Sequence, residues 1–269
     1  MELKIENITY KESKIILNKI NLDLKSDKIS FLVSSNYKKL KNLLNIISIN
    51  QQPTSGSIFI NGEKLTKNNI KELKQNIGFC PNKNHFIKDT IKEEIEYISK
   101  KYKDSIKEKR IINTLKMVNL PISYLDKDPN KLSSGEKQKL SLALVLVHNP
   151  KIIILENPTQ NLDSTAKNHL IKLLKLMKLR YNKNIIIVSK DEELILQLAD
   201  EIYILENDIS KYNDKYEFFQ NKEIIKRLHL NTPKTIEFSN LVKNKYNINI
   251  GFRDNINDLI KDIYRFVNY

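Results

Sequence analysis

The segment LSSGEKQKL, residues 132–140, joins small polar residues to the start of an apolar helical pattern. Ser133, Ser134 and Gly135 precede apolar residues that recur with helical spacing through Val147. The N-terminus of a helix offers unpaired backbone N–H groups and the positive end of the helix dipole, so a serine hydroxyl placed there helps to form a site for an anion such as phosphate. The alternative is that Ser133 only caps the helix, because serine is a favoured N-cap residue.

Phosphate chemistry also depends on glycine, because loops that wrap phosphates with N–H groups need residues at positive φ. The chain contains only 5 glycines in 269 residues, well below the usual share of about 7 %. A phosphate-binding loop must lie near one of these glycines or do without them; they are Gly56, Gly62, Gly78, Gly135 and Gly251.

The elements that would position these residues alternate along the chain. Continuous apolar runs predict buried strands at residues 29–33, 151–155, 185–188 and 201–205. Helical spacing predicts helices at residues 40–49, 90–118, 135–147, 164–179 and 191–198. Strands that alternate with helices predict a parallel sheet, while the alternating pattern before residue 25 and the turn Asn61-Gly62 predict antiparallel strands.

The alternation ends after Asn207. The last part of the chain predicts three short amphipathic helices, at residues 216–228, 233–243 and 255–267. A chain of 269 residues is long enough for one large core and a modest appendage. We therefore expect an α/β domain over residues 1–208 and a small, mainly helical extension over residues 209–269.

Composition narrows the classes of protein. The net charge of +14 invites a nucleic-acid interpretation, but the lysines are spread along the whole chain without an aromatic-rich basic stripe, so we expect no nucleic-acid partner. No apolar run approaches the roughly 18 residues of a membrane span, and the N-terminus lacks a signal-peptide pattern. The single cysteine, Cys80, cannot form an internal disulfide. These features predict a soluble protein of the reducing cytoplasm.

Four motifs follow one another in the order and spacing of the ABC ATPase family. They are TSGSIFING (54–62), IGFCPN (77–82), LSSGEKQKL (132–140) and KIIILENPTQNLD (151–163), which resemble a family turn, the Q-loop strand, the signature and the Walker B stretch. The resemblance covers about residues 1–208. It implies a P-loop NTPase-like cassette with a parallel sheet core, an antiparallel β subdomain and a helical subdomain at about residues 90–147. Residues 216–242 resemble the C-terminal extension of the ATPase subunits of energy-coupling-factor transporters, which import vitamins and metals.

The loop that binds phosphates in this family is replaced here by SSNYKKLKN, residues 34–42. By the resemblance, the family's glycines, lysine and Ser/Thr pair fall on Ser34, Tyr37, Lys39, Leu40, Lys41 and Asn42, with Asn36 and Lys38 between them. Tyrosine and lysine adopt positive φ only at a cost of about 1 kcal/mol or more. Making Lys39 or Lys41 the phosphate lysine instead puts Lys38 or Leu40 in the last glycine position. We therefore expect weak or no ATP binding at this site.

Three further positions depart from the family. The general base of Walker B becomes Asn157, whose neutral amide cannot accept a proton, and the preceding aspartate becomes Glu156, which has the length to reach Mg²⁺ through a water molecule. The switch histidine becomes Lys190, a cation of different reach, and the Q-loop glutamine becomes Asn82, which is one methylene shorter. The resemblance therefore implies that this chain does not hydrolyse ATP at its own site.

Other positions match the family. Tyr10 lies where an aromatic residue stacks on adenine, although an ordinary strand tyrosine would look the same. The signature keeps Ser133 and Gly135, with Ser134 for glycine and Glu136 for glutamine as modest departures; Asp163 keeps the place of the D-loop aspartate, which acts across the dimer. In ABC dimers each ATP lies between the Walker motifs of one subunit and the signature of the other. The lost residues therefore act on the chain's own site, and the retained ones act on a partner's site.

This asymmetry favours the degenerate half of a heterodimeric uptake transporter, most nearly of the energy-coupling-factor class. The expected partners are a second ATPase subunit with intact Walker motifs, which would hold ATP and Mg²⁺ at the dimer interface, and a membrane-embedded subunit that chooses the substrate. The expected location is peripheral, at the cytoplasmic face of the cell membrane. Two alternatives stay open: a divergent but active ATPase, alone or as a homodimer, and a non-transport member that acts on nucleic acid.

Overall fold

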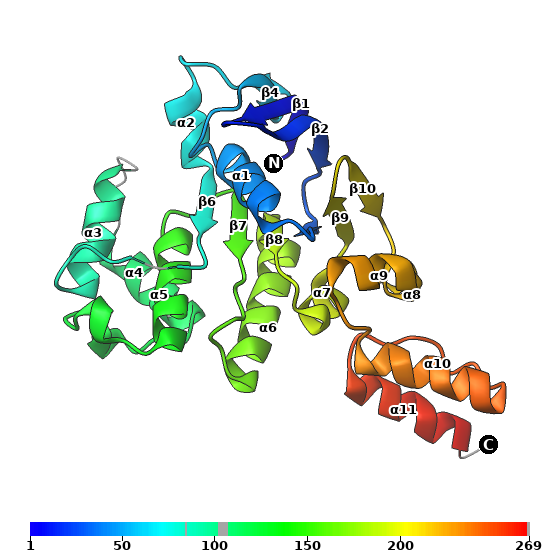
Figure 1. The fold of residues 1–269 in the computed structure, drawn as a ribbon. Helices are drawn as coiled ribbons and strands as arrows, with labels where there is room; N and C mark the ends of the chain where they lie inside the picture. The colour runs from blue at the N-terminus through cyan, green and yellow to red at the C-terminus, as the bar shows by residue number, and fades with distance from the viewer. Residues whose placement is uncertain (84, 102–106, 268–269) are drawn as a thin grey trace.

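The computed structural model describes residues 1–83, 85–101 and 107–267, and it contains two sheets flanked by helices (Figure 1). The N-terminal sheet has the order β2-β1-β4-β5 and is antiparallel. Its strands are β1 (Leu3–Lys11), β2 (Ile15–Leu24), β4 (Ser55–Ile60) and β5 (Glu63–Lys64). The turn between β4 and β5 places Asn61 at φ 51° and Gly62 at φ 79°, which is the hairpin geometry that Asn-Gly favours.

The central sheet has the order β10-β9-β3-β8-β7-β6. The strands are β3 (Ile29–Val33), β6 (Ile77–Cys80), β7 (Ile152–Glu156), β8 (Asn184–Val188), β9 (Glu201–Leu205) and β10 (Ile209–Tyr212). All neighbouring strands are parallel except β10, which runs antiparallel to β9. The expected parallel sheet is confirmed, and so is the α/β cassette architecture.

Two hydrophobic cores lie on the two faces of the central sheet. Successive side chains of a strand point to opposite faces, and in β7 Ile152 and Ile154 join one core while Ile153 and Leu155 join the other. The first core lies against the N-terminal sheet and α1 (Tyr37–Ile47), and the second lies against α5 (Ser134–Leu146), α6 (Ser164–Tyr181) and α7 (Glu192–Leu198). Buried on both faces, β7 is apolar until its last residue, Glu156, which the sheet therefore delivers to its carboxyl edge.

The short helix α2 (Ile70–Gln75) precedes β6. A helical region then connects β6 to β7, and it contains α3 (Ile91–Lys101), α4 (Glu108–Met117), the short turns Ile122–Tyr124 and Pro129–Lys131, and α5. The pattern at residues 90–118 predicted helix throughout; residues 102–106 of it lie outside the described ranges. Figure 1 shows α3, α4 and α5 grouped on one side of the sheet.

The C-terminal part begins with a strand that the sequence pattern did not predict. The boundary expected after residue 208 falls between β9 and β10, which are hydrogen-bonded neighbours. The helices α8 (Lys215–Gln220) and α9 (Lys222–Leu228) then pack on the second core, where Phe218 and Phe219 are 0 % and 1 % exposed. These residues therefore share the core of the cassette.

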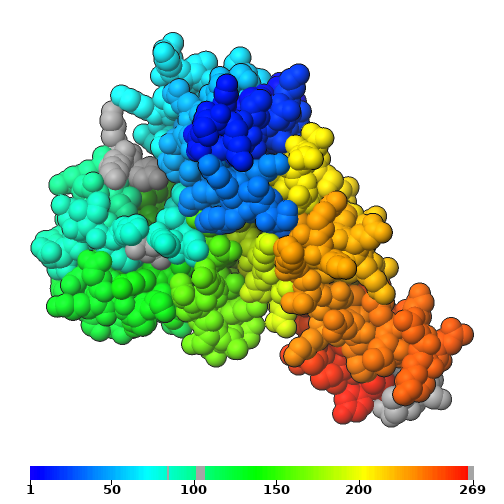
Figure 2. All heavy atoms as spheres, viewed as in Figure 1, coloured from blue at the N-terminus to red at the C-terminus, as the bar shows by residue number. Residues whose placement is uncertain are grey.

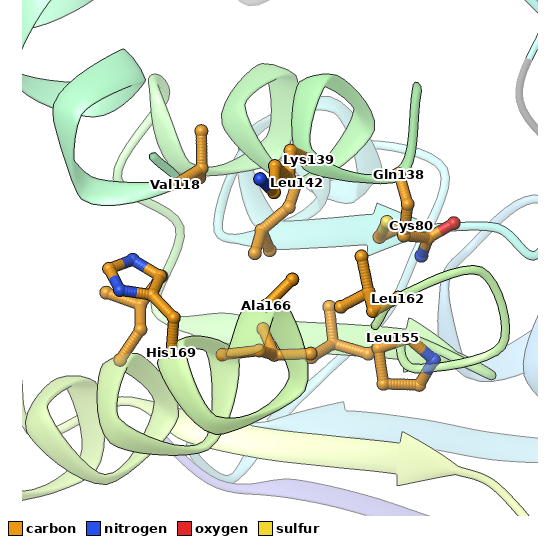
Figure 3. Close-up of a pocket in the computed structure, with 12 residues that line it drawn as sticks. Cys80, Val118, Gln138, Lys139, Leu142, Leu155, Leu162, Ala166 and His169 are labelled. Atoms are coloured by element: carbon orange, nitrogen blue, oxygen red, sulfur yellow. The ribbon is translucent and has the colours of Figure 1, made fainter. Parts of the chain in front are cut away.

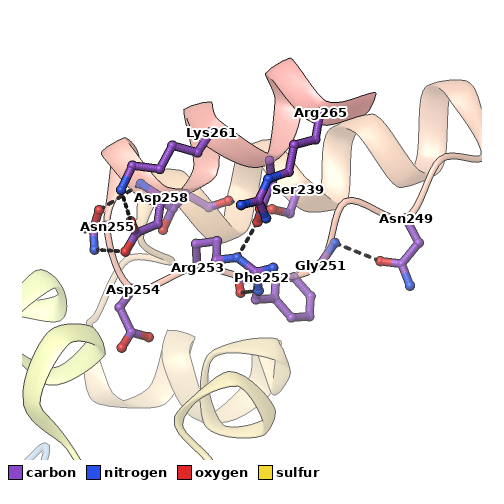
Figure 4. Close-up of polar contacts among 12 residues, drawn as sticks. Ser239, Asn249, Gly251, Phe252, Arg253, Asp254, Asn255, Asp258, Lys261 and Arg265 are labelled. Atoms are coloured by element: carbon purple, nitrogen blue, oxygen red, sulfur yellow. Dashed lines mark hydrogen bonds and ion pairs between the residues drawn. The ribbon is translucent and has the colours of Figure 1, made fainter. Parts of the chain in front are cut away.

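The helices α10 (Lys234–Tyr246) and α11 (Ile256–Val267) lie side by side and project from the rest of the molecule (Figures 1 and 2). Two polar contacts join α11 to the loop before it: Asn255 donates to Asp258 (2.8 Å), and Arg253 pairs with Asp262 (Figure 4). Within α11, Lys261 also pairs with Asp258 (3.1 Å). Among the described residues, we find no helix with the length and apolar character needed to cross a bilayer.

Candidate functional site

The loop after β3 is shorter than a phosphate cradle. Helix α1 begins at Tyr37, three residues before the expected start at residue 40, and Asn36 is its N-cap. The side-chain oxygen of Asn36 accepts a hydrogen bond from the N–H of Lys39 (3.1 Å), and the backbone carbonyl of Asn36 accepts one from the N–H of Leu40 (3.2 Å). Of residues 34–42, all of which are described, none has a positive φ. An ordinary strand-turn-helix therefore stands where the family's loop would wrap phosphates.

The polar groups of this turn bond to the protein itself. The Ser34 hydroxyl donates to the carbonyl of Leu205 (2.5 Å) and accepts from the N–H of Asn36 (3.0 Å). The N–H and hydroxyl of Ser35 both donate to the carboxylate of Glu206, at 3.2 Å and 2.9 Å. These hydroxyl and N–H donors of the turn are therefore already hydrogen-bonded to acceptors of the protein.

The basic residues of the loop do not converge on one point. Lys38 forms an exposed ion pair with Glu12 (2.6 Å), and the Lys39 ammonium donates to the carbonyl of Glu206 (2.8 Å). At the family's lysine position, Leu40 is 4 % exposed and belongs to the first core. Asn42 is also buried, and its amide donates to the carbonyl of Lys38 (2.9 Å). Leu40 and Asn42 therefore stabilise the fold and do not face a ligand.

Glu156 is where the site's side chains meet. Its carboxylate is fully buried and accepts hydrogen bonds from the Tyr37 hydroxyl (2.6 Å), the Lys41 ammonium (3.2 Å) and the backbone N–H of Asn82 (3.1 Å). Tyr37 and Lys41 are four residues apart and so share one face of α1. The length of Glu156 would let it reach a metal through water; in the structure an ammonium, a phenol and an N–H group contact its oxygens.

The contact of Tyr37 with Glu156 is not predicted by the resemblance, in which Tyr37 is only a poor replacement for glycine. Burial, followed by the hydrogen bond to Glu156 and its charge, raises the pKa of Tyr37 to about 12. The phenol is therefore a protonated donor at neutral pH. A signal was present: a tyrosine and a lysine at helical spacing beside a strand that ends in glutamate.

The residues at the positions of the general base and the switch histidine, Asn157 and Lys190, form hydrogen bonds with backbone carbonyl groups. Asn157 has φ 47°, a left-handed conformation that asparagine tolerates, and its N–H donates to the carbonyl of Val188 (2.8 Å). The Lys190 ammonium donates to the carbonyl of Leu228 at the end of α9 (2.8 Å). By the resemblance Lys190 occupies the position that contacts the γ-phosphate; in the structure its ammonium bonds to the C-terminal segment.

ATP with Mg²⁺ is the cofactor that the resemblance implies, and the residues of this site do not fit it. The turn has no left-handed residue to direct N–H groups at phosphates. An ammonium, that of Lys41, contacts the carboxylate that would serve the metal. Within the described residues, no group of three or more His, Cys, Asp or Glu side chains is arranged to hold a metal ion.

The signature forms a complete capping box at the start of α5. Ser133 is the N-cap; its hydroxyl accepts from the N–H of Glu136 (3.3 Å), and its own N–H donates to the Glu136 carboxylate (2.9 Å). Tyr124 also donates to Glu136 (3.0 Å). The hydrogen bonds from the Ser133 N–H and hydroxyl hold the pKa of Glu136 below its usual value. Ser133 is thus a helix cap, and both Ser133 and Ser134 remain exposed at the helix N-terminus.

The first turn of α5 lies against the loop that leads to α6. A Cβ at Gly135 would come within 3.0 Å of the carbonyl oxygen of Asn161, so this position favours glycine. Asp163 is the exposed N-cap of α6 and accepts from the N–H of Ala166 (2.7 Å). Deeper between α5 and α6 lies a cavity of about 20 Å³ (Figure 3), which has room for about one water molecule. The cavity is therefore far too small for a nucleotide.

Tyr10 lies in β1, where it pairs with Leu17 of β2 and packs partly buried against the first core. This is the environment of an ordinary strand tyrosine. Tyr10 is half-buried, and stacking of its ring on adenine stays a prediction.

Comparisons with known proteins agree with this architecture. A family model described as ABC transporter matches residues 17–160. An energy-coupling factor transporter ATP-binding protein of Mycoplasma mobile is 29 % identical over 250 residues, which cover 90 % of each chain. Another, from Clostridium perfringens, is 26 % identical over 259 residues, which cover 91 % of each chain.

Solved structures agree as well. A dimeric bacterial ABC transporter cassette superposes with a TM-score of 0.71 at 25 % identity, covering 78 % of this chain and 98 % of that one. A component of an ABC transporter complex from Clostridium perfringens gives a TM-score of 0.70 at 24 % identity, covering 88 % of this chain and 97 % of that one. Because the family model spans more than half of the 269 residues and the cassette architecture accompanies it, this chain belongs to the ABC transporter family of ATP-binding cassette proteins.

Proposed function

We propose that this chain is a cassette subunit of an uptake transporter of the energy-coupling-factor class and forms the degenerate half of a heterodimer. In this proposal it does not hydrolyse ATP at its own site and lends its signature to the ATP site of a partner. The proposal keeps residues 1–208 as the cassette, with a helical subdomain at about residues 90–147, and residues 209–269 as the extension, whose β10, α8 and α9 share the central sheet and the second core of the cassette.

The observation that carries the proposal is the set of contacts around Glu156. An active site must leave its metal-binding carboxylate open to Mg²⁺ and its loop N–H groups open to phosphates. Here Lys41 and Tyr37 contact the carboxylate, and Glu206 accepts from the N–H and hydroxyl of Ser35. With asparagine at position 157, no carboxylate is left there to polarise water.

The signature differs from this site in that its two serines are exposed. Ser133 and Ser134 lie at the N-terminus of a 13-residue helix. The N–H and hydroxyl of Ser133 bond to the Glu136 carboxylate in the capping box, so the groups proposed to favour an anion are the N–H groups of Ser134 and Gly135 and the helix dipole. Gly135 lies against the loop before α6, and Asp163 is exposed at its end. The exposure of the two serines at the helix N-terminus supports the proposal that they meet a phosphate held by another subunit.

The relatives and the exposed surface support the proposed partners. The Mycoplasma mobile and Clostridium perfringens relatives are named as ATP-binding proteins of energy-coupling factor transporters, and the cassette with a TM-score of 0.71 is dimeric. We propose a second ATPase subunit that holds ATP and Mg²⁺, and a membrane-embedded subunit that docks near residues 82–90 and the helical subdomain. The chain would then lie at the cytoplasmic face of the membrane. Exposed apolar side chains on α10 and α11, such as Leu241 and Tyr264, suit pairing with the partner's equivalent segment.

The test is to purify the chain in complex with the proposed second ATPase subunit and to replace Ser133 by arginine. The guanidinium would intrude on the partner's phosphate site, so we expect ATP hydrolysis by the complex to fall at least about 100-fold, as when a transition-state donor is removed. The matched control is Asn168→Arg, an exposed position within α6, which should keep the wild-type rate.

Circular dichroism of the Ser133→Arg subunit should show an intact fold. A folded Ser133→Arg complex that hydrolyses ATP at the wild-type rate would refute the lending of the signature. Hydrolysis by the chain alone would favour the alternative of a divergent but self-sufficient ATPase.

A further inference from the structure

The carboxylate of Glu156 is a buried charge that needs compensation. Its side chain is 0 % exposed, and an ionised carboxylate buried without a partner is strongly destabilising. Glu156 ends β7, and its hydrogen-bond donors come from two other segments: α1, and the chain that leaves β6 at Asn82. One carboxylate thus joins the sheet, α1 and the entry to the helical region.

Lys41 supplies the positive charge. Its ammonium lies 3.2 Å and 3.4 Å from the two oxygens of Glu156, and its side chain is 39 % exposed, so one end of the pair is dry and the other reaches water. Tyr37, one helical turn earlier, adds a short hydrogen bond of 2.6 Å to one of those oxygens. The same face of α1 therefore provides a cation and a neutral donor.

A negative charge of the protein itself also lies beside the turn before α1. The Glu206 carboxylate accepts from the N–H and hydroxyl of Ser35 in the turn before α1, and the Lys39 ammonium bonds to the backbone carbonyl of Glu206. The Glu206 carboxylate is thus the anion beside the turn, and the Lys41 ammonium is the cation beside Glu156.

We propose that Lys41 is a resident cation that takes the place of a divalent metal at Glu156, so that α1, β7 and the exit of β6 hold their relative positions without metal or nucleotide. This inference extends the proposed function, because it concerns the same degenerate site. It makes the cassette independent of Mg²⁺ on its own side of the dimer. Its test uses the isolated full chain and does not depend on whether the signature acts on a partner.

The test is divalent-cation rescue. Millimolar Mg²⁺ or Mn²⁺ should leave the melting temperature of the wild-type chain unchanged, because Lys41 already neutralises Glu156. Lys41→Ser removes the ammonium and leaves a small hydroxyl beside the carboxylate. We expect its melting temperature to fall by about 5 °C and to recover by at least half when Mn²⁺ or Mg²⁺ is added.

Two controls make the result specific. Lys38→Ser removes an exposed lysine from the preceding turn of the same helix, paired with Glu12, and should cause neither a comparable fall nor a rescue. Lys41→Ser with Glu156→Gln removes both charges and should melt above Lys41→Ser without responding to metal.

The outcomes separate the role of charge from that of packing. A Lys41→Ser chain that folds only with divalent ions, or a double variant that folds where the single one does not, would support the resident cation. A Lys41→Ser chain that is unaffected, or is destabilised equally with and without Glu156 and without rescue, would overturn it. The melting of the Lys41 variants does not depend on the signature, so failure of the proposed signature role in the complex would leave the conclusion about Lys41 unchanged.

Discussion

Lys190 donates a hydrogen bond of 2.8 Å to the carbonyl oxygen of Leu228, the last residue of α9. His229 follows at φ 55°, so the helix ends in a left-handed residue, and the ammonium lies at the negative end of the helix dipole. The position that carries the switch histidine in the family thus holds the cassette to the segment after β10.

Replacing Lys190 by methionine should destabilise the protein by about 1 kcal/mol, because a helix C-terminus loses a charged donor. Urea unfolding followed by circular dichroism measures this loss. Lys222→Met, at the opposite end of α9 and exposed, is the control and should cost nothing measurable. Equal effects of the two substitutions would contradict the capping role of Lys190.

The isolated chain should bind ATP with a dissociation constant of about 1 mM or weaker, which corresponds to about −4 kcal/mol, and should release no phosphate above background. Leu40→Lys, which restores the family's lysine, should not raise affinity. It should lower stability by more than about 2 kcal/mol, because the side chain at position 40 is 4 % exposed and packs in the core. Calorimetry measures binding; a micromolar constant for the wild type would show that the turn before α1 can rearrange around phosphates.

Asp191 should make stability depend on pH. Burial acts to raise its pKa, but hydrogen bonds from Lys167, the N–H of Leu194 and Thr159 outweigh burial and hold the pKa below its ordinary value. A carboxyl with a lowered pKa in the folded state stabilises above its unfolded pKa of about 3.9, and that contribution is lost as the pH falls through the folded value.

The Asp191→Asn variant should therefore be less stable than the wild type by about 1 kcal/mol at neutral pH. The difference should narrow as the pH falls below about 4. Urea unfolding of both proteins across this range measures it, with Asp126→Asn, at an exposed position, as the control. A difference that stays constant down to pH about 3 would mean that the charge of Asp191 is unimportant.

Phe218 tests whether the segment after residue 208 belongs to the core of the cassette. Its ring is 0 % exposed and meets the Phe219 ring edge to face at 5.0 Å. Phe218→Ala should cost about 3–5 kcal/mol. Phe238→Ala, in α10 and 43 % exposed, should cost less than about 1 kcal/mol. Thermal unfolding distinguishes the two, and a small effect at Phe218 would restore an independent extension after residue 208.

The sequence predicted much of the fold because the central strands are buried on both faces. Continuous apolar runs such as residues 152–155 have few alternatives to a buried strand between helices, and the observed strands agree with the predicted ranges within one or two residues. β10 was missed because this exposed edge strand, Ile209–Tyr212, has only half-buried and exposed residues. It pairs with β9 through backbone hydrogen bonds, and an apolar or polar side-chain pattern does not predict such a pairing.

At the candidate site too, some features depend on the sequence alone and others on the tertiary structure. The sequence by itself determined which chemical groups were missing, because no folding can give Asn157 a carboxylate or Leu40 a charge. The tertiary structure decided what the remaining groups do: α1 begins at Tyr37, and so Tyr37 and Lys41 meet Glu156 across 119 and 115 residues of sequence. Such contacts depend on where a helix starts and which face it turns to the sheet, and both are set by packing against the cores.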